Sequence, residues 1–265
     1  MTILITVLSF VFGTAIGSFC NVVIYRLHSG DSPLRGRSFC PSCKHTLEAN
    51  DLVPILSFLM LRGKCRYCKA RISLQYPLVE LASGIITLLM VLQFGISVAA
   101  LLGMILGAFL VVIFVYDLKH ELILDRVSIP AMAVAIAASL ALHRTFTSVV
   151  LGGILGAGFF LLQYLISRGK WIGGGDIRLG AVLGLALGWP LILVSLVIAY
   201  LTGAIAAIVL IAAKKRSMSS MVPFGTFLSL AGVITFLWGS AILQWYQHGG
   251  FFDWVVNNIL RYYNP

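Results

Sequence analysis

The residues best suited to chemistry in this chain of 265 amino acids are two aspartates and four cysteines. Asp117 and Asp176 stand at the ends of apolar segments, in a chain that otherwise keeps charge out of its hydrophobic runs. Because charge at membrane depth is costly, an ionisable side chain there is in itself a functional-site hypothesis. Two carboxylates that meet at one membrane edge would suit acid–base chemistry with a shared proton. The glycines Gly173, Gly174 and Gly175 would let a substrate backbone approach Asp176 closely.

The composition places these residues in a membrane protein. The chain is 60% hydrophobic and only 11% charged, whereas soluble domains usually have about 25% charged residues. Residues 2–25 carry no charge, and this length is enough to span the hydrocarbon core of a bilayer. The segment lacks a basic start and a small-residue cleavage site, so we interpret it as an anchor rather than a removed signal peptide.

Other charge-free stretches predict seven further passes. The two longest each suit a pair of helices, because Gln93-Phe94-Gly95 interrupts one and Gly188-Trp189-Pro190 interrupts the other, where proline disfavours continuation. We therefore predict an all-α polytopic membrane protein with about eight transmembrane helices. The seven passes are expected in residues 81–116 (two), 127–143, 145–167, 179–213 (two) and 221–243.

The positive charges orient these passes. If the first helix enters from outside, the cytoplasmic segments hold 17 of the 19 lysine and arginine residues. Following the positive-inside rule, we expect both termini to be extracytoplasmic, and Asp117 and Asp176 to lie at the cytoplasmic face. The net charge of +10 is then first a signal of topology, and it does not require nucleic-acid binding. The cytoplasmic segments are residues 26–75, 117–126, 168–178 and 214–220.

The longest polar segment, residues 26–75, contains two C-x2-C pairs. Twenty-one residues separate the first pair, Cys40 and Cys43, from the second, Cys65 and Cys68. Four thiolates can surround Zn²⁺ tetrahedrally. Two disulfides, free thiols, or a binuclear or redox site are the alternatives, and a cytoplasmic location disfavours disulfides. Because the segment has little apolar material for its own core, we predict a small zinc-stapled subdomain between the first two transmembrane helices.

Helix capping is the structural alternative for the aspartates near the membrane. An aspartate at a helix N-terminus is a favourable cap, which suits Asp176, and the same role is expected for Asp125 at the start of the fourth helix. Asp117 fits that alternative less well, because it ends the third helix, where a negative charge opposes the helix dipole.

Other candidate residues have simpler expected roles. Asp51 is expected in a solvated structural position, and Cys20 is expected to pack within the first helix. Glu80 is either an interfacial acid that balances Arg71 or another cation, or a functional residue. The apolar run 52–61 is short and contains a proline, so a packed or interfacial segment is expected rather than a pass.

Five short motifs follow one another along nearly the whole chain. They are Gly17-Ser18-Phe19-Cys20-Asn21-Val22-Val23-Ile24-Tyr25-Arg26-Leu27, the two cysteine pairs, Gln75-Tyr76-Pro77-Leu78-Val79-Glu80, Asp117-Leu118-Lys119-His120-Glu121-Leu122-Ile123-Leu124-Asp125, and Gly173-Gly174-Gly175-Asp176. In this order they resemble the type IV prepilin peptidases, bacterial relatives of the GxGD intramembrane aspartyl proteases. The family commonly has proline at the Leu124 position and leucine at the Cys20 position, so this sequence departs from the family pattern at the start of the fourth helix and within the first.

The resemblance implies a function. Asp117 and Asp176 would activate water to cut the leader peptide from type IV prepilins and pseudopilins at the cytoplasmic face of the bacterial inner membrane. Many bacterial members also methylate the new amino terminus with S-adenosylmethionine. The resemblance associates this second activity with the cysteine insert and with Gly17, Ser18, Asn21 and Glu80. No glycine-rich dinucleotide fingerprint is present, so the methyl donor rests on the resemblance alone.

The expected organisation has four parts. Residues 1–25 form the first helix, 26–75 the zinc-binding insert and 76–243 the catalytic bundle, while 244–265 form an aromatic interfacial tail. Two other interpretations are an ion- or proton-coupled transporter and a zinc-stapled scaffold without chemistry. A transporter predicts acids near mid-membrane and an inverted repeat, whereas these acids lie at one edge and no convincing repeat is found.

Overall fold

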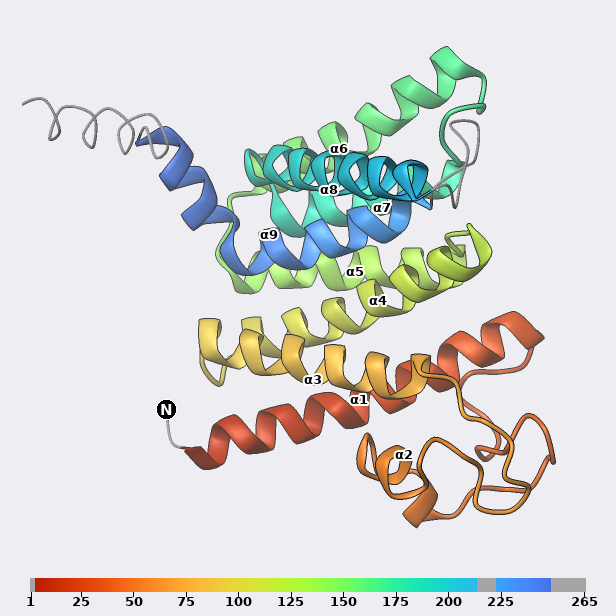
Figure 1. Cartoon of the computed structure of the whole chain (residues 1–265). Coiled ribbons are helices and arrows are strands. Elements are labelled where there is room, and N and C mark those ends of the chain that lie inside the picture. Colours follow the sequence, from red (N-terminus) through yellow and green to blue (C-terminus); the bar gives the residue numbers. More distant parts are fainter. Residues whose placement is uncertain (1–2, 214–222, 249–265) are drawn as a thin grey trace, which may run out of the picture. The chain divides into compact units, whose positions relative to one another are not determined.

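The structure, a computed structural model, describes residues 3–213 and 223–248. Within these residues every extended regular element is a helix (Figure 1), which confirms the predicted all-α fold. The chain divides into two compact units, Met1–His143 and Arg144–Pro265.

The first unit holds four long helices and the cysteine-bearing insert. Helix α1 packs against α3 and α4, and α4 packs in turn against α3 and α5. The insert joins α1 to α3 and contains only two short helices, η1 and α2. The bounds are α1 Ile3–Ser29, η1 Ala49–Asp51, α2 Leu56–Met60, α3 Gln75–Phe94, α4 Val98–His120 and α5 Asp125–Ala141.

In its described residues, 144–213 and 223–248, the second unit has four helices, and α6 and α7 form the closest pair. Helix α8 packs against α9, and both contact α7. Asp176 lies in the first turn of α7, so the packing of α7 fixes the position of this carboxylate. The bounds are α6 Phe146–Ser167, α7 Gly174–Leu187, α8 Leu191–Ala212 and α9 Phe224–Gln247.

Each of the eight predicted passes corresponds to one long helix. Six of these helices, namely α1, α3, α4, α6, α8 and α9, are long and apolar enough to cross a membrane. Helix α5, with 17 residues, and α7, with 14, are shorter than the roughly 20 residues that a perpendicular crossing needs. The structure therefore supports a multi-pass membrane protein in which eight is an approximate number of spans.

The predicted breaks between helices are confirmed. Helix α3 ends at Phe94, and Gly95 follows with φ 66°, a conformation that favours glycine. After this break, α4 begins behind Ser97, whose hydroxyl accepts the backbone N–H of Ala100 at 3.1 Å as an N-cap. At the second break, α7 ends before Gly188, which has φ 69°.

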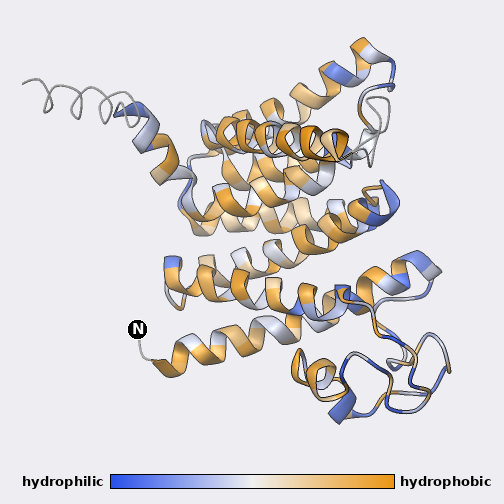
Figure 2. Cartoon of the chain, viewed as in Figure 1, coloured by the Kyte–Doolittle hydropathy of each residue, from blue (hydrophilic) through white to orange (hydrophobic). Residues whose placement is uncertain are grey.

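Apolar side chains cover the outer faces of these helices. Figure 2 shows the long helices coloured mostly as hydrophobic, with hydrophilic residues gathered at helix ends and in the insert. Leu4, Leu92, Leu162 and Ile205 are each more than half exposed within the chain. Such faces are stable only against lipid or another apolar surface, in agreement with the membrane assignment.

Glycines allow α6 and α7 to approach at backbone distance. A Cβ atom added at Gly152 or Gly156 would clash with the backbone of Gly184 or Gly180 across the pair, and the converse additions would clash equally. Close packing of this kind, mediated by small residues, is typical of membrane helices. This packing fixes α7 against α6, and with it the start of α7, where Asp176 lies.

Three local predictions, for Asp125, for residues 52–61 and for the tail 244–265, have different outcomes. The N-cap of α5 is Leu124, and Asp125 is the first helical residue, so the expected N-cap role of Asp125 is wrong by one position. Residues 52–61 form no pass, as expected, since they contain only the five-residue helix α2. The predicted tail 244–265 begins within α9, and its residues beyond 248 lie outside the described part, as does the whole of the fourth basic segment, 214–220.

Candidate functional site

Asp117 lies in the last full turn of α4 and is only 4% exposed. Its backbone carbonyl accepts the N–H of Glu121 at 2.8 Å, where Glu121 ends the helix in a left-handed conformation. In the same turn, the His120 ring stacks on His28 of α1 with centroids 4.1 Å apart, and it also contacts Tyr116. The structure therefore places Asp117 in the last turn of its helix, as expected.

Asp176 is the third residue of α7 and is 8% exposed. Its Oδ2 atom accepts the backbone N–H of Gly173 at 3.1 Å, which folds the glycine segment back over the start of the helix. Gly173 has an extended backbone, and nothing lies within 4 Å of a Cβ added at Gly174. The glycine segment thus leaves open space beside the carboxylate, although the aspartate also serves its own helix terminus.

An aromatic cluster lies in the second unit around the start of α9. The Tyr200 ring is 4.8 Å from that of Phe224, and Phe224 contacts Phe160 on α6 at 5.8 Å. The Tyr200 hydroxyl donates to Gln163 Oε1 at 3.0 Å. Sequence reasoning did not identify this cluster, because its members come from three helices and share no local motif.

The four predicted metal ligands come together. The sulfur atoms of Cys40, Cys43, Cys65 and Cys68 all lie within 4.8 Å of one another. Cys40 Sγ and Cys68 Sγ are 3.9 Å apart, far beyond a disulfide bond of about 2.05 Å. A tetrahedral site with metal–sulfur bonds of about 2.3 Å requires sulfur–sulfur distances of about 3.8 Å, so this cluster fits one metal ion.

Each cysteine pair sits in the same local fold. The N–H of Lys44 bonds back to the Cys40 carbonyl at 2.8 Å, and the N–H of Lys69 bonds to the Cys65 carbonyl at 3.0 Å. Both lysines adopt positive φ angles, of 61° and 62°. The repeated Cys-x2-Cys-Lys sequence therefore encodes two equivalent turns that present their thiols to a common centre.

The local surroundings shift the pKa values of Cys40 and Cys68 in opposite directions. Burial raises the pKa of Cys40, but hydrogen bonds from the backbone of Cys43 and Ser42 outweigh burial and lower that pKa to about 7. The backbone of Ala70 lowers the pKa of Cys68, but desolvation and the neighbouring sulfurs outweigh it and raise that pKa to about 11. A bound cation would remove the mutual repulsion and allow all four thiols to ionise.

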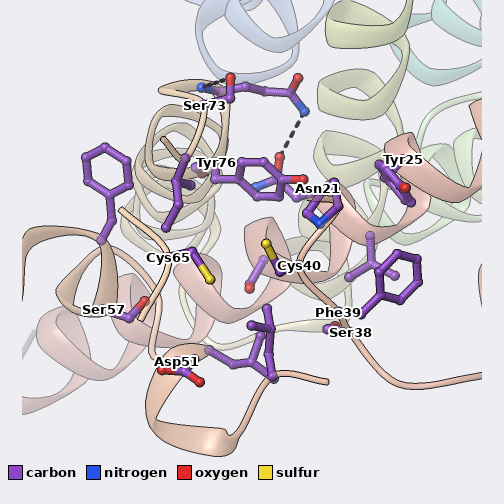
Figure 3. Close-up of a pocket in the computed structure, with 18 of the residues that line it drawn as sticks. Asn21, Tyr25, Ser38, Phe39, Cys40, Asp51, Ser57, Cys65, Ser73 and Tyr76 are labelled. Carbon is purple, nitrogen blue, oxygen red and sulfur yellow. Dashed lines mark hydrogen bonds between the residues drawn. The ribbon is translucent and has the colours of Figure 1, made fainter. Parts of the chain in front are cut away.

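A cavity of about 560 Å³ lies beside this cluster, between the insert and the cytoplasm-facing ends predicted for α1, α3 and α4. Figure 3 shows Asn21 and Tyr76, from α1 and α3, on one side of the cavity and Cys40 and Cys65 of the insert on the other. His28, Lys119 and His120 also line the cavity. The size falls within the range of about 300–1,000 Å³ that is usual for small-molecule sites.

One wall of the cavity is organised by Arg26, which is 7% exposed. Its two terminal nitrogens donate to five backbone carbonyls of the following loop, at distances from 2.6 Å to 3.3 Å. The planar guanidinium suits such multiple contacts, which lysine could not reproduce. Because the guanidinium of Arg26 donates its hydrogen bonds to these carbonyls, we interpret Arg26 as a residue that holds the loop in place as a wall of the cavity. The acceptors are Ser32, Pro33, Arg35, Gly36 and Arg37.

The expected solvated position of Asp51 is wrong, because its side chain is only 3% exposed. Asp51 accepts hydrogen bonds from Arg66 Nε at 2.6 Å, from the Tyr67 hydroxyl at 3.0 Å and from the Glu48 backbone at 3.2 Å. Burial raises the pKa of Asp51, but these bonds outweigh it and hold the pKa below its usual value. The network ties the second cysteine pair to the rest of the insert.

Glu80 is 8% exposed and reaches the cavity from α3. Its Oε2 atom accepts the backbone N–H of Ile55 at 2.7 Å, and the Ser18 hydroxyl provides a second hydrogen bond. Within residues 3–213 and 223–248, no lysine, arginine or histidine forms an ion pair with Glu80. The expected balance with Arg71 is therefore not found in the described part of the chain.

The remaining residues of the candidate methyl-transfer region have distinct surroundings. Asn21 is 2% exposed, donates to the Tyr76 carbonyl at 3.0 Å and accepts from Gln75 Nε2 at 3.1 Å. Ser18 lines the cavity. Gly17 lies at a close crossing of α1 and α3, where an added Cβ would fall 2.6 Å from the Cα of Glu80. The structure thus brings Ser18, Asn21 and Glu80 to one cavity and gives Gly17 a packing role beside it.

Comparison with known proteins settles the family. Residues 11–94 match the Bacterial Peptidase A24 N-terminal domain, and residues 104–208 match the type IV leader peptidase family. The "Prepilin leader peptidase/N-methyltransferase" of Aeromonas salmonicida is 33% identical, with 90% of this chain and 92% of that protein covered. This chain belongs to the type IV leader peptidase family. It is a peptidase of that family, which favours the enzymatic interpretation over the transporter and the scaffold.

Other relatives agree in name and coverage. The protein of the same name from Legionella pneumophila is 30% identical over 89% of this chain and 92% of its own length. The one from Burkholderia pseudomallei is 34% identical over 87% and 84%. No solved structure matches the chain.

Family membership also clarifies two departures from the family sequence. Leu124 stands where the family commonly has proline, yet its backbone is extended, with φ −84° and ψ 136°, and α5 still begins at the next residue. Cys20, where leucine is common, is 2% exposed and packs with its sulfur 3.8 Å from the Ala108 carbonyl. The fifth cysteine is therefore a packing residue, as expected.

Proposed function

We propose that this leader peptidase family member cuts the leader peptide from type IV prepilins and pseudopilins, with Asp117 and Asp176 as its catalytic pair. The observation that carries the proposal is that both carboxylates are buried, at 4% and 8% exposure, in a chain with few acids. Both also fall within residues 104–208, the part that matches the peptidase family. Buried carboxylates at helix ends are costly features that are normally kept for function.

In the proposed reaction, one carboxylate accepts a proton from water, and the water oxygen attacks the scissile carbonyl. The other carboxyl donates a proton to the leaving amine. Such general acid–base pairs contribute on the order of 100- to 10,000-fold each to rate, and the two groups titrate as a coupled pair. The open side of Gly174 would allow the extended substrate backbone to pass close to Asp176.

The substrate is held mainly by its apolar helix. The leader peptides are short and basic, and the predicted cytoplasmic segments of this chain are basic too, so overall electrostatic attraction is a poor account of recognition. Docking of the substrate helix among the membrane helices places the junction between leader and helix at the cytoplasmic face of the inner membrane. This location agrees with the positive-inside charge pattern.

A cleavage assay in detergent with a purified prepilin tests the catalytic pair. Asp117→Asn and Asp176→Asn should each lower kcat by at least about 100-fold. Asp125→Asn is the matched control, since it makes the same change at an exposed aspartate at the start of α5 and should cleave normally. Cleavage that survives in either of the first two variants would rule out the proposed pair.

The same chain is proposed to methylate the new amino terminus with S-adenosylmethionine, as the names of its relatives state for those proteins. The cavity of the first unit, with Ser18, Asn21 and Glu80 on its walls, supports this proposal. Transfer of a labelled methyl group to a cleaved pilin would test it. A preparation that cleaves but transfers no label would restrict the enzyme to proteolysis.

The tetra-cysteine cluster is proposed to hold Zn²⁺ as a structural ion. Four sulfur donors with no open position are typical of structural zinc sites. Such a metal would neutralise the thiolates and staple the two cysteine turns, and it takes no part in either reaction. Elemental analysis of the purified protein should find one zinc per chain, and finding another metal would change the assignment.

A further inference from the structure

The Glu80 carboxylate is the unbalanced charge of the cavity. It is 8% exposed, and its two hydrogen bonds come from neutral donors, the Ile55 N–H and the Ser18 hydroxyl. A buried carboxylate without a cation is costly, even when it is hydrogen-bonded. A protein that keeps such a group beside an open cavity has a site suited to a positively charged ligand.

The other buried charges around the cavity are already satisfied. Asp51 is paired with Arg66 at 2.6 Å, and Arg26 is surrounded by backbone carbonyls. These groups hold the walls in place and offer little to a ligand. Glu80 therefore differs from Asp51, the other acid that lines the cavity, in having no partner of opposite charge in the described part of the chain.

The rest of the lining suits a ligand that has an aromatic ring and a carboxylate besides its cation. Tyr25 and Phe39 meet edge to face at 5.9 Å, and Tyr76 also lines the cavity (Figure 3). Aromatic faces of this kind stack on planar rings. Arg37 and Arg71 also line the cavity and have the charge to receive a carboxylate.

We propose that Glu80 faces the sulfonium centre of S-adenosylmethionine in this cavity and makes the site prefer the sulfonium donor over its thioether product. The inference rests on the proposed methyl transfer and adds to it the position and the charge selectivity of the donor site. It also gives a reason for product exchange, because the charge that Glu80 attracts disappears when the methyl group leaves.

The charge change follows from the reaction itself. The lone pair of the neutral pilin amine forms a bond to the methyl carbon, the carbon–sulfur bond breaks, and its electron pair stays on sulfur. The sulfonium becomes the neutral thioether S-adenosylhomocysteine, while the nitrogen becomes positive and then releases a proton to solvent. Glu80 thus attracts the donor before transfer and no longer holds the product by charge after it.

Binding of the two sulfur compounds to the purified full chain tests this inference. Dissociation constants are measured by calorimetry for S-adenosylmethionine and S-adenosylhomocysteine, and the ratio of the two is the readout. The wild type should bind the sulfonium form about tenfold more tightly. Glu80→Gln keeps an oxygen for the Ile55 N–H but removes the charge, so its ratio should fall to about one.

Two further variants separate charge from shape. Glu80→Asp keeps the charge and should keep a preference for the sulfonium form. Asp31→Asn removes one negative charge from an exposed part of the same insert and should bind as the wild type does. Metal content and the thermal unfolding midpoint show whether each variant has folded.

The outcomes distinguish this inference from the proposed function. A wild type that binds neither compound and transfers no methyl group contradicts the methyltransferase proposal, and the donor site with it. A wild type that transfers methyl groups but binds both compounds equally overturns only the role of Glu80. An unchanged ratio in folded Glu80→Gln overturns it as well, and if that variant does not fold, the wild-type ratio alone decides.

Discussion

The two compact units position their buried charges in different ways. In the first unit, an irregular insert with very short helices contains the four clustered thiols, the Asp51–Arg66 pair and the loop carbonyls that bind Arg26, and a cavity lies between this insert and α1, α3 and α4. In the second unit, long helices pack through glycines, and Asp176 is held at the start of α7 by the backbone. Polar groups thus shape a small-molecule site in one unit, and close helix packing fixes a single carboxylate in the other.

Removal of one thiol should have the largest effect and should remain within the first unit. Cys43→Ser leaves three sulfur ligands, and the metal should be lost, because binding contributes on the order of 10 kcal/mol to folding in small zinc modules. Metal analysis together with limited proteolysis of residues 30–74 checks this. Digestion of the insert should leave α6 to α9 protected. Digestion of both units would contradict the claim that the two units are held by different interactions.

Disruption of the α6–α7 contact should be the most damaging change in the second unit. Gly184→Val would drive a side chain into the backbone of Gly152 and Gly153 and should destabilise the protein by about 3 kcal/mol or more. The thermal unfolding midpoint measures this. Gly158→Val is the matched control on α6, because nothing lies within 4 Å of its added Cβ. Equal midpoints for the two variants would show that glycine packing does not hold α7.

Asp51 should show a smaller effect that depends on pH. Asp51→Asn weakens three hydrogen bonds and should cost about 1–3 kcal/mol at neutral pH. The pKa of Asp51 is lower in the folded chain, so its contribution is complete above the ordinary value of 3.8 and is lost as pH falls through the folded value. The difference in unfolding midpoint between wild type and variant should therefore shrink below about pH 4. A difference that grows on acidification would mean that the ion pair is not the cause.

Cys20 should show the smallest effect and should separate the fifth cysteine from the other four. Cys20→Ala removes one buried sulfur from the α1–α4 contact and should cost about 1 kcal/mol. Metal content should be unchanged, as measured on the same sample that provides the unfolding midpoint. Loss of metal would assign Cys20 to the cluster.

Much of this architecture is readable from the sequence. The breaks at Gly95 and Gly188 and the convergence of four cysteines follow from local rules about glycine, proline and C-x2-C spacing. The surroundings of Asp51 and Glu80 do not. Both depend on contacts between residues far apart in the sequence, namely Arg66 with Asp51, 15 positions apart, and Ile55 with Glu80, 25 positions apart, and no local pattern records such pairings.

The shorter helices show a second limit of the sequence. The lengths of α5 and α7 depend on where capping begins, and a charge-free run cannot show that α7 starts at Gly174 and stops after 14 residues. The cavity is likewise a product of the insert lying against α1, α3 and α4. Arg26, one of the charged residues that line the cavity, lies within the first motif of the sequence. Only the five carbonyl contacts of its guanidinium reveal that its role is structural.

The most direct test of the whole account measures both activities in one purified variant. Asp176→Asn is incubated with a full prepilin and, separately, with a pilin whose leader has already been removed, both with labelled S-adenosylmethionine. The account predicts a loss of leader cleavage of at least about 100-fold, while methylation of the processed pilin continues, because the cavity lies in the first unit. Continued cleavage, or loss of methylation in a variant with normal metal content and unfolding midpoint, would contradict it.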